Sequence, residues 1–283
     1  MPWCAALSLT LQCNSQITGK IKMPNFKAQI SKYSLKRILL LLAFGFCHLT
    51  LYSQNKLDVI YLDAGHGGKD PGTIGDVTGV QEKNIVLPIT IKLGKMIEEK
   101  YPDIKIIYSR TTDEYSQVRD RTIAANNNKA KLFVSIHANH KKKEESDKKG
   151  FEIYLLNKER FPEAVEFTMK QNYQIAFEQF GKDTLDNFIF SSLAHAGYTR
   201  FSEYFASIIE VNMLSHTELI SRGIIQAGNW VTLGASMPSV LVETGYLSDL
   251  TDEKYLSSEK GQNDVAIALF NAFLHYKSLY ESQ

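Results

Sequence analysis

Cysteine is scarce in this chain of 283 residues, and its three copies all lie near the N-terminus, at Cys4, Cys13 and Cys47. The long segment that follows has no thiol for a disulfide bond, a thiolate zinc site or a cysteine nucleophile. Any metal or hydrolytic chemistry in that segment must therefore use other side chains.

An excess of charge of either sign is also missing. The chain has 32 Lys and Arg against 31 Asp and Glu, a formal net charge of +1. A nucleic-acid-binding protein normally shows a basic face or stripe. The densest charge cluster, His140 to Lys149, mixes both signs between two strand-like segments, which is typical of a solvated loop. We therefore expect no nucleic-acid partner.

Long apolar runs are absent except for Ile38 to Phe46. Basic residues precede this run and small or polar residues follow it, which is the outline of a secretory signal peptide. The run is short for a membrane span, although an uncleaved anchor is the alternative. We expect residues 1–53 to be an N-terminal extension and signal peptide, with the true start at Met23 and cleavage after Ser53. The mature protein would be exported and periplasmic or associated with the cell envelope.

Strand-like and helix-like segments alternate after residue 53. The apolar patterns predict strands over 57–63, 104–110, 131–139, 151–156 and within 238–248. They predict helices over 82–100, 117–128, 162–180, 201–220 and 263–280. This alternation predicts a single α/β domain over 54–283, with a mostly parallel twisted sheet flanked by helices on both faces.

Four polar residues stand where apolar patterns stop or begin. His66, His137 and Glu243 each follow a buried-type strand, and Glu82 opens the first long helix. Ligands of parallel sheets bind at the carboxyl ends of the strands, so these side chains are expected at one edge. Two imidazoles and one carboxylate with an open fourth position are the ligand set of a catalytic zinc, and the remaining carboxylate can act as a base.

Taken singly, two of these residues have simpler explanations. His66 alone would be a turn residue, and Glu82 alone a favourable charge at a helix N-terminus. His137 and Glu243 are harder to explain in that way, because a buried imidazole needs a partner and a carboxylate after "VLV" is costly to bury. The interpretation as a metal site depends on the four together.

The stretch "YLDAGHGGKDPG", Tyr61 to Gly72, is rich in glycine but does not match a phosphate-binding loop. "GHGGKD" has Asp70 where the hydroxyl residue of a P-loop would stand, and the dinucleotide pattern GxGxxG fails as well. We therefore expect no nucleotide ligand.

Five separated motifs resemble, in order, those of the zinc-dependent N-acetylmuramoyl-L-alanine amidases, the amidase type 3 family. They are "YLDAGHGGKDPGTIG", "EKNIVL", "SIHAN", "RGI" and "MPSVLVETGYLSD". The resemblance covers roughly Leu57 to Lys277. It implies a peptidoglycan hydrolase that cuts the amide between the lactyl group of N-acetylmuramic acid and the L-alanine of the stem peptide.

The resemblance also implies roles for single residues. His66, Glu82 and His137 would hold one zinc ion per chain, which activates water. Glu243 would accept the proton of that water and later deliver one to the departing alanine nitrogen. Three further residues are candidates for supporting the ligands or contacting substrate: Asp63, Asn139 and Arg222. For Asp63 and Asn139, a simple turn role is the alternative.

The chain departs from compact family members between Leu156 and Phe201, where a helical insert is expected at about 157–200. In some amidases of cell division, an insert at this place resembles an autoinhibitory helix that a partner displaces. One hypothesis is that the insert gates the metal through Glu163, Glu166 or Glu178, under the control of an activator protein. The alternative is a stabilising helix or a wall of the substrate groove.

Two other functions stay open on the same fold. One is a zinc peptidase that acts on the stem peptide, and the other is an inactive peptidoglycan-binding module. The leading prediction is an amidase that acts on peptidoglycan or a muropeptide, is a monomer, and serves cell-wall remodelling, including daughter-cell separation.

Overall fold

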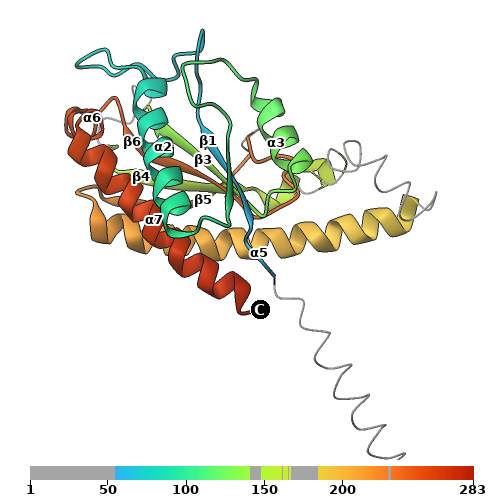
Figure 1. Ribbon diagram of the computed structural model, residues 1–283. Helices are drawn as coiled ribbons and strands as arrows, with labels where there is room; N and C mark the ends of the chain where they lie inside the picture. Colours follow the sequence, from blue (N-terminus) through green and yellow to red (C-terminus); the bar gives the residue numbers. More distant parts are fainter. Residues whose placement is uncertain (1–54, 141–147, 161, 165, 167–183, 229–230) are drawn as a thin grey trace, which may run out of the picture. The chain divides into compact units, whose positions relative to one another are not determined.

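A six-stranded sheet forms the centre of the protein (Figure 1), in the strand order β2-β1-β3-β6-β4-β5. The strands are β1 (Val59–Ala64), β2 (Lys105–Tyr108), β3 (Leu132–Asn139), β4 (Phe151–Leu156), β5 (Ser221–Ala227) and β6 (Ser239–Tyr246). Strands β2, β1, β3 and β6 are parallel to one another, whereas β4 is antiparallel to β6 and parallel to β5. The predicted α/β fold with a mostly parallel sheet is confirmed, and β5 is a strand that the sequence patterns did not predict.

The helices are α2 (Glu82–Lys100), α3 (Val118–Asn127), α5 (Thr184–His216), α6 (Leu250–Ser257) and α7 (Glu259–Glu281), with a 3-10 turn at Lys158–Arg160. This computed structural model describes residues 55–140, 148–160, 162–164, 166, 184–228 and 231–283, with the side chains of α5 described from residue 192 onward. The predicted signal peptide lies outside the described residues. No helix in these ranges is both long and apolar enough to cross a membrane.

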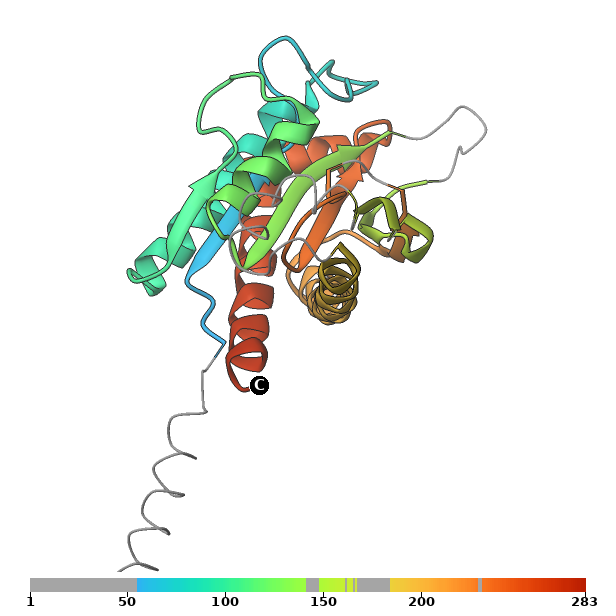
Figure 2. The same ribbon diagram turned by 90° about the vertical axis from the view of Figure 1, so that its right-hand side faces the viewer.

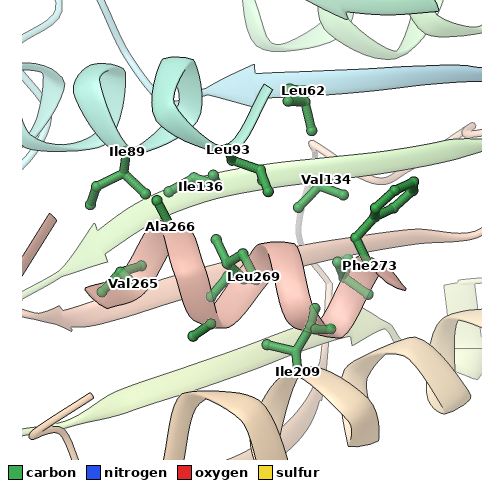
Figure 3. Close-up of a cluster of buried hydrophobic side chains, with 14 of the residues drawn as sticks. Leu62, Ile89, Leu93, Val134, Ile136, Ile209, Val265, Ala266, Leu269 and Phe273 are labelled. Carbon is green, nitrogen blue, oxygen red and sulfur yellow. The ribbon is translucent and has the colours of Figure 1, made fainter. Parts of the chain in front are cut away.

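The larger hydrophobic core lies on the face of the sheet that α2, α5 and α7 cover. Figure 3 shows α7 in the middle of this core, between α2, α5 and the strands. Its Leu269 and Phe273 are buried together with Leu93 of α2 and Ile209 of α5. Figure 2 looks along α5 and shows β3 and β6 side by side with their arrowheads pointing the same way. The apolar stripes of these helices therefore find the cover that an amphipathic helix needs.

A smaller core lies on the opposite face, where α3 packs. Tyr61 and Phe133 stack with their ring centroids 5.4 Å apart, and Ala125 of α3 and Leu241 of β6 belong to the same cluster. Side chains alternate along a strand, so odd-numbered residues of β1, β3 and β6 share this face. Towards the carboxyl edge the same alternation brings polar residues in place of apolar ones: Asp63, Ser135, His137 and Glu243.

The reversed direction of β4 and β5 completes this edge. Because β4 runs antiparallel to β6, its first residues lie beside the last residues of β6, and Glu152 is the register partner of Glu243. Strand β5 is parallel to β4, so β5 also begins at this edge, with Arg222 as its second residue. The site is thus bounded by the ends of three strands and the beginnings of two others.

Candidate metal centre and active site

Three side chains converge at the carboxyl edge of the sheet. His66, Glu82 and His137 each offer a ligand atom, and these atoms lie within 4.8 Å of one another. The two oxygens of Glu82 face the two rings: Oε2 is 3.1 Å from Nε2 of His66, and Oε1 is 2.9 Å from Nδ1 of His137. The structure therefore brings together the residues that the sequence motifs singled out. His66 comes from the loop after β1, Glu82 from the start of α2 and His137 from β3.

The backbone around His66 is held in a conformation that few residues with a side chain adopt. Its φ is +57°, in the left-handed region. Arg121 donates hydrogen bonds to the carbonyls of Ala64 and His66, and Arg110 donates to those of Ala64 and Gly65. Two buried guanidinium groups thus fix the turn that aims His66 at the other ligands.

Two glycines are required where the loop touches the ligands. A Cβ atom on Gly65 would lie 2.5 Å from the ring of His137. A Cβ atom on Gly72, whose φ is +67°, would lie 2.5 Å from Oε2 of Glu82 and 2.6 Å from the ring of His66. The glycines of the opening motif therefore leave room for the side chains of the candidate ligands.

Glu82 is the most firmly placed of the three candidate ligands. Its side chain is 3% exposed and accepts hydrogen bonds from the backbone amides of Thr73 (2.8 Å) and Ala138 (2.9 Å). It stands at the first position of α2, where a negative charge is favoured by the helix dipole. These bonds keep both oxygens on the cleft side of the helix.

The electrostatics of the three residues are coupled. Burial alone would raise the pKa of Glu82, but hydrogen bonds from His137 and His66 hold that pKa well below the ordinary range. Burial alone would lower the pKa of His137, but the hydrogen bond and charge of Glu82 raise it to about 9. The pKa of His66 is raised for the same reason. A metal ion would have to displace protons from these rings.

Glu243 lies beside the cluster and carries an unused oxygen. It is the register partner of His137 in the parallel ladder of β3 and β6. Its Oε2 atom is buried and has no hydrogen-bond partner among the described residues. Burial raises the pKa of Glu243 to about 7. The charge of His137 opposes this shift, and the charges of Glu82 and Glu152 reinforce it. A carboxyl group with such a pKa can hold or release a proton near neutrality.

An open hollow of about 430 Å³ adjoins these groups. It is lined by His66, Asp70, Gly72, Thr73, Glu82, His137, Ala138, Asn139 and Glu243. All four predicted site residues thus face one cavity.

In the structure, the residue that supports His66 is Asp70 and not Asp63. Asp70 accepts a hydrogen bond from the outer nitrogen of His66, with Oδ2 2.9 Å from Nδ1. Asp63 is fully buried and binds Arg121 and the hydroxyl of Ser135, both at 2.7 Å. Asp63 therefore acts on the turn through Arg121. Asp70 sits four residues after His66 in the same motif, and only that spacing could have suggested it.

Asn139 and Arg222 meet at a residue that the sequence analysis missed. Asn139 donates a hydrogen bond to Oε2 of Glu152 at 2.9 Å, and Nε of Arg222 lies 3.5 Å from Oε1 of the same carboxylate. In sequence, Glu152 is a single acidic residue within the apolar strand "FEIYLL", and that interruption is the signal that could have found it.

The candidate gating residues do not join the metal cluster in the part of the chain that the structure describes. Glu163 is paired with Arg160, whose Nε and Nη2 both lie 2.8 Å from its oxygens. Glu166 is exposed. Glu178 lies outside the described residues. Gating therefore stays a prediction.

Comparison with known proteins agrees with these motifs. The pattern of the N-acetylmuramoyl-L-alanine amidase family matches residues 60–275. The chain is 28% identical over 230 residues to the N-acetylmuramoyl-L-alanine amidase AmiA of Salmonella typhimurium, across 80% of this chain and 78% of that protein.

Two solved structures extend the likeness to the fold. The amidase AmiC2 of Nostoc punctiforme is 26% identical with a TM-score of 0.59, over 78% of this chain and 98% of that one. The N-acetylmuramoyl-L-alanine amidase of Clostridium difficile 630 is 28% identical with a TM-score of 0.59, over 78% and 97%. The match along most of the chain shows that it belongs to the N-acetylmuramoyl-L-alanine amidase family and is a cell-wall amidase.

Proposed function

We propose that this amidase hydrolyses the bond between the lactyl group of N-acetylmuramic acid and the L-alanine of the stem peptide, with one zinc ion held by His66, Glu82 and His137. The observation that carries the proposal is the pairing of this ligand set with Glu243, whose buried Oε2 has no partner among the described residues. A metal site and a separate proton carrier are the two parts that amide hydrolysis needs.

The donor set fits zinc. Two imidazole nitrogens and one carboxylate leave a fourth position open, which distinguishes catalytic zinc sites from closed structural ones. When bound, zinc would supply Lewis-acid stabilisation of the developing oxyanion and lower the pKa of water. Asp70 would support His66 by accepting from its outer nitrogen, as carboxylates commonly do for metal-bound imidazoles.

The proton transfers belong to Glu243. In this proposal its carboxylate accepts a proton from the attacking water and returns one to the alanine nitrogen as the amide bond breaks. Its position beside His137 keeps it within the same cavity as the ligands. Because this carboxyl has a raised pKa, it can serve in both directions near neutral pH.

The cellular setting is also part of the proposal. We infer that residues 1–53 direct export, that the enzyme acts in the periplasm or cell envelope, and that it remodels the wall during daughter-cell separation. Support comes from the signal-like sequence and from relatives such as AmiA. Whether an activator acts on the 157–200 insert can be examined with Glu178→Ala. Gating predicts a rise in activity for this variant, whereas a stabilising helix or a wall of the substrate groove predicts no rise.

Product analysis tests the reaction itself. Purified sacculi are digested with the zinc-loaded enzyme, with and without a chelator, and the released peptides are identified by mass spectrometry. We expect intact stem peptides with an alanine amine terminus, and none after chelation. Stem peptides cut internally would instead indicate the peptidase, and binding without any product would indicate the inactive module.

A further inference from the structure

Glu152 is a second carboxylate at the active-site edge, and the proposed reaction leaves it unused. It is 3% exposed and lies directly opposite Glu243 in the antiparallel ladder of β4 and β6. Directly opposed residues point to the same side of a sheet. Glu152 therefore shares the face of Glu243 and of His137, which is the next register partner along the row.

Three hydrogen bonds hold the carboxylate of Glu152. Oε2 accepts hydrogen bonds from Asn139 (2.9 Å) and from the hydroxyl of Tyr154 (2.6 Å). Oε1 accepts from the hydroxyl of Tyr246 (2.7 Å) and lies 3.5 Å from Nε of Arg222. A carboxylate offers about four acceptor positions, so these three hydrogen bonds leave one position, on the oxygen nearest to Arg222. Glu152 is thus held in one orientation and positions its neighbours.

Arg222, in contrast, is held loosely. Its side chain is 31% exposed, and the 3.5 Å distance to Glu152 exceeds that of a charge-assisted hydrogen bond. Neither terminal nitrogen of this guanidinium donates a hydrogen bond to any residue within the described ranges. The planar guanidinium group of Arg222, whose paired donors suit a carboxylate, is therefore available at the edge of the site.

The strand bends where it presents Arg222. The register of β4 and β5 shifts between Phe151 and Ile153, and Gly223 has a φ of +95° with open space where a Cβ would be. Such bulges re-aim a side chain next to active sites. The irregularity faces Glu152, so the anion and the bulge together set the direction of the guanidinium.

We propose that Arg222 binds a free carboxylate on the peptide side of the scissile amide, with Glu152 as its positioning residue. The inference rests on the proposed function. Strands lie about 4.7–4.9 Å apart, so β5 is about 10 Å from Glu243 on β6. An extended peptide spans about 3.3–3.6 Å per residue. The carboxylate would therefore belong to the second or third residue of the stem peptide.

Two synthetic muropeptides that differ only in this group, one with the carboxylate and one with a carboxamide, provide the test. We expect the wild-type enzyme to prefer the carboxylate by about 10- to 100-fold in kcat/KM, as for a hydrogen bond to a charged group. Arg222→Gln should abolish the preference, because kcat/KM for the carboxylate substrate falls to the level of the carboxamide substrate. Arg222→Lys should keep part of it, because lysine retains the charge without the fork.

The control is Arg200→Gln. Arg200 contacts Tyr204 on the surface of α5, and its loss should affect neither substrate. An equal loss with both substrates in Arg222→Gln, or no preference in the wild type, would overturn the proposal.

A binding experiment separates this inference from the reaction. Calorimetry measures the affinity of zinc-loaded wild type and Arg222→Gln for the free stem peptide in its carboxylate and carboxamide forms. A carboxylate preference that the variant loses supports the inference even if neither muropeptide is cut, in which case the proposed function alone fails. Equal binding of the two peptides, or binding of neither, contradicts the inference.

Discussion

Gly65 determines how closely the loop after β1 approaches His137. A Cβ atom there would lie 2.5 Å from the imidazole, so Gly65→Ala must push the ring away from the other ligands. We expect zinc affinity to fall by at least about 10-fold, as when the support of a metal ligand is lost. Competition with a chromogenic chelator measures this, and Gly197→Ala is the matched control, because nothing lies within 4 Å of its added methyl group.

Glu243→Gln separates metal binding from proton transfer. The variant should retain zinc and lose at least about 100-fold in kcat, since general acid-base catalysis is removed. Retained zinc by elemental analysis with full turnover would contradict the assigned role.

The pH dependence of the wild type follows from the same carboxyl group. Burial raises the pKa of Glu243 to about 7, and a bound cation lowers it by favouring the charged form. Glu243 must be ionised to accept a proton, so kcat/KM should rise with pH along an acid limb that lies below 7. A profile measured between about pH 4 and pH 9 checks this, and a flat acid side would count against Glu243 as the base.

At this scale the sequence was informative about the candidate ligands and less informative about their supports. His137 and Glu243 stand out because each is a polar residue at the end of an apolar run. Asp70 and Glu152 carry weaker signals, which are a spacing of four residues from His66 and a single acidic residue within an apolar strand. Their partners depend on which way a side chain points and on which strand lies opposite, and tertiary packing sets both.

The loop between β1 and α2 depends on the buried pair of Arg121 and Asp63. Both side chains are almost fully enclosed, at 3% and 0% exposed, and they contact at 2.7 Å. Arg121→Met would leave Asp63 buried without its cation and remove the side-chain donor to the carbonyl of His66, whereas the carbonyl of Ala64 would keep the hydrogen bond from Arg110. We expect a loss of about 3–5 kcal/mol in the free energy of unfolding, measured by chemical denaturation. Arg200→Met, on the exposed surface of α5, should cost less than about 0.5 kcal/mol.

The elements themselves were largely predictable, and their pairing was not. Helix α2 begins and ends as the sequence predicted, at Glu82 and Lys100. The antiparallel direction of β4 could not be predicted, because an apolar run reads the same in either direction. Helix α5 starts at Thr184, well before the predicted start at residue 201, because its early residues lack a regular apolar spacing.

For the whole molecule, metal binding and stability should be linked through pH. The pKa of His137 is raised to about 9 by Glu82, so the stabilisation from this pair is complete below the unfolded value of about 6.5 and is lost as pH rises through 9. Zinc requires the neutral ring, so the proton competes with it. The gain in Tm on adding zinc to chelated protein should therefore grow from about pH 6 to pH 9. A gain that does not change with pH would show that His137 is not a ligand.

Because β4 and β5 run in the opposite direction to the other strands, the active site is built from two kinds of chain segment. The metal half comes from segments that leave strands, after β1 and along the ends of β3 and β6, whereas Glu152 and Arg222 come from segments that enter strands. Loops that precede β4 and β5 can therefore change in length or composition while His66, Glu82 and His137 keep their geometry. The fold permits substrate preference to diversify separately from the hydrolytic chemistry.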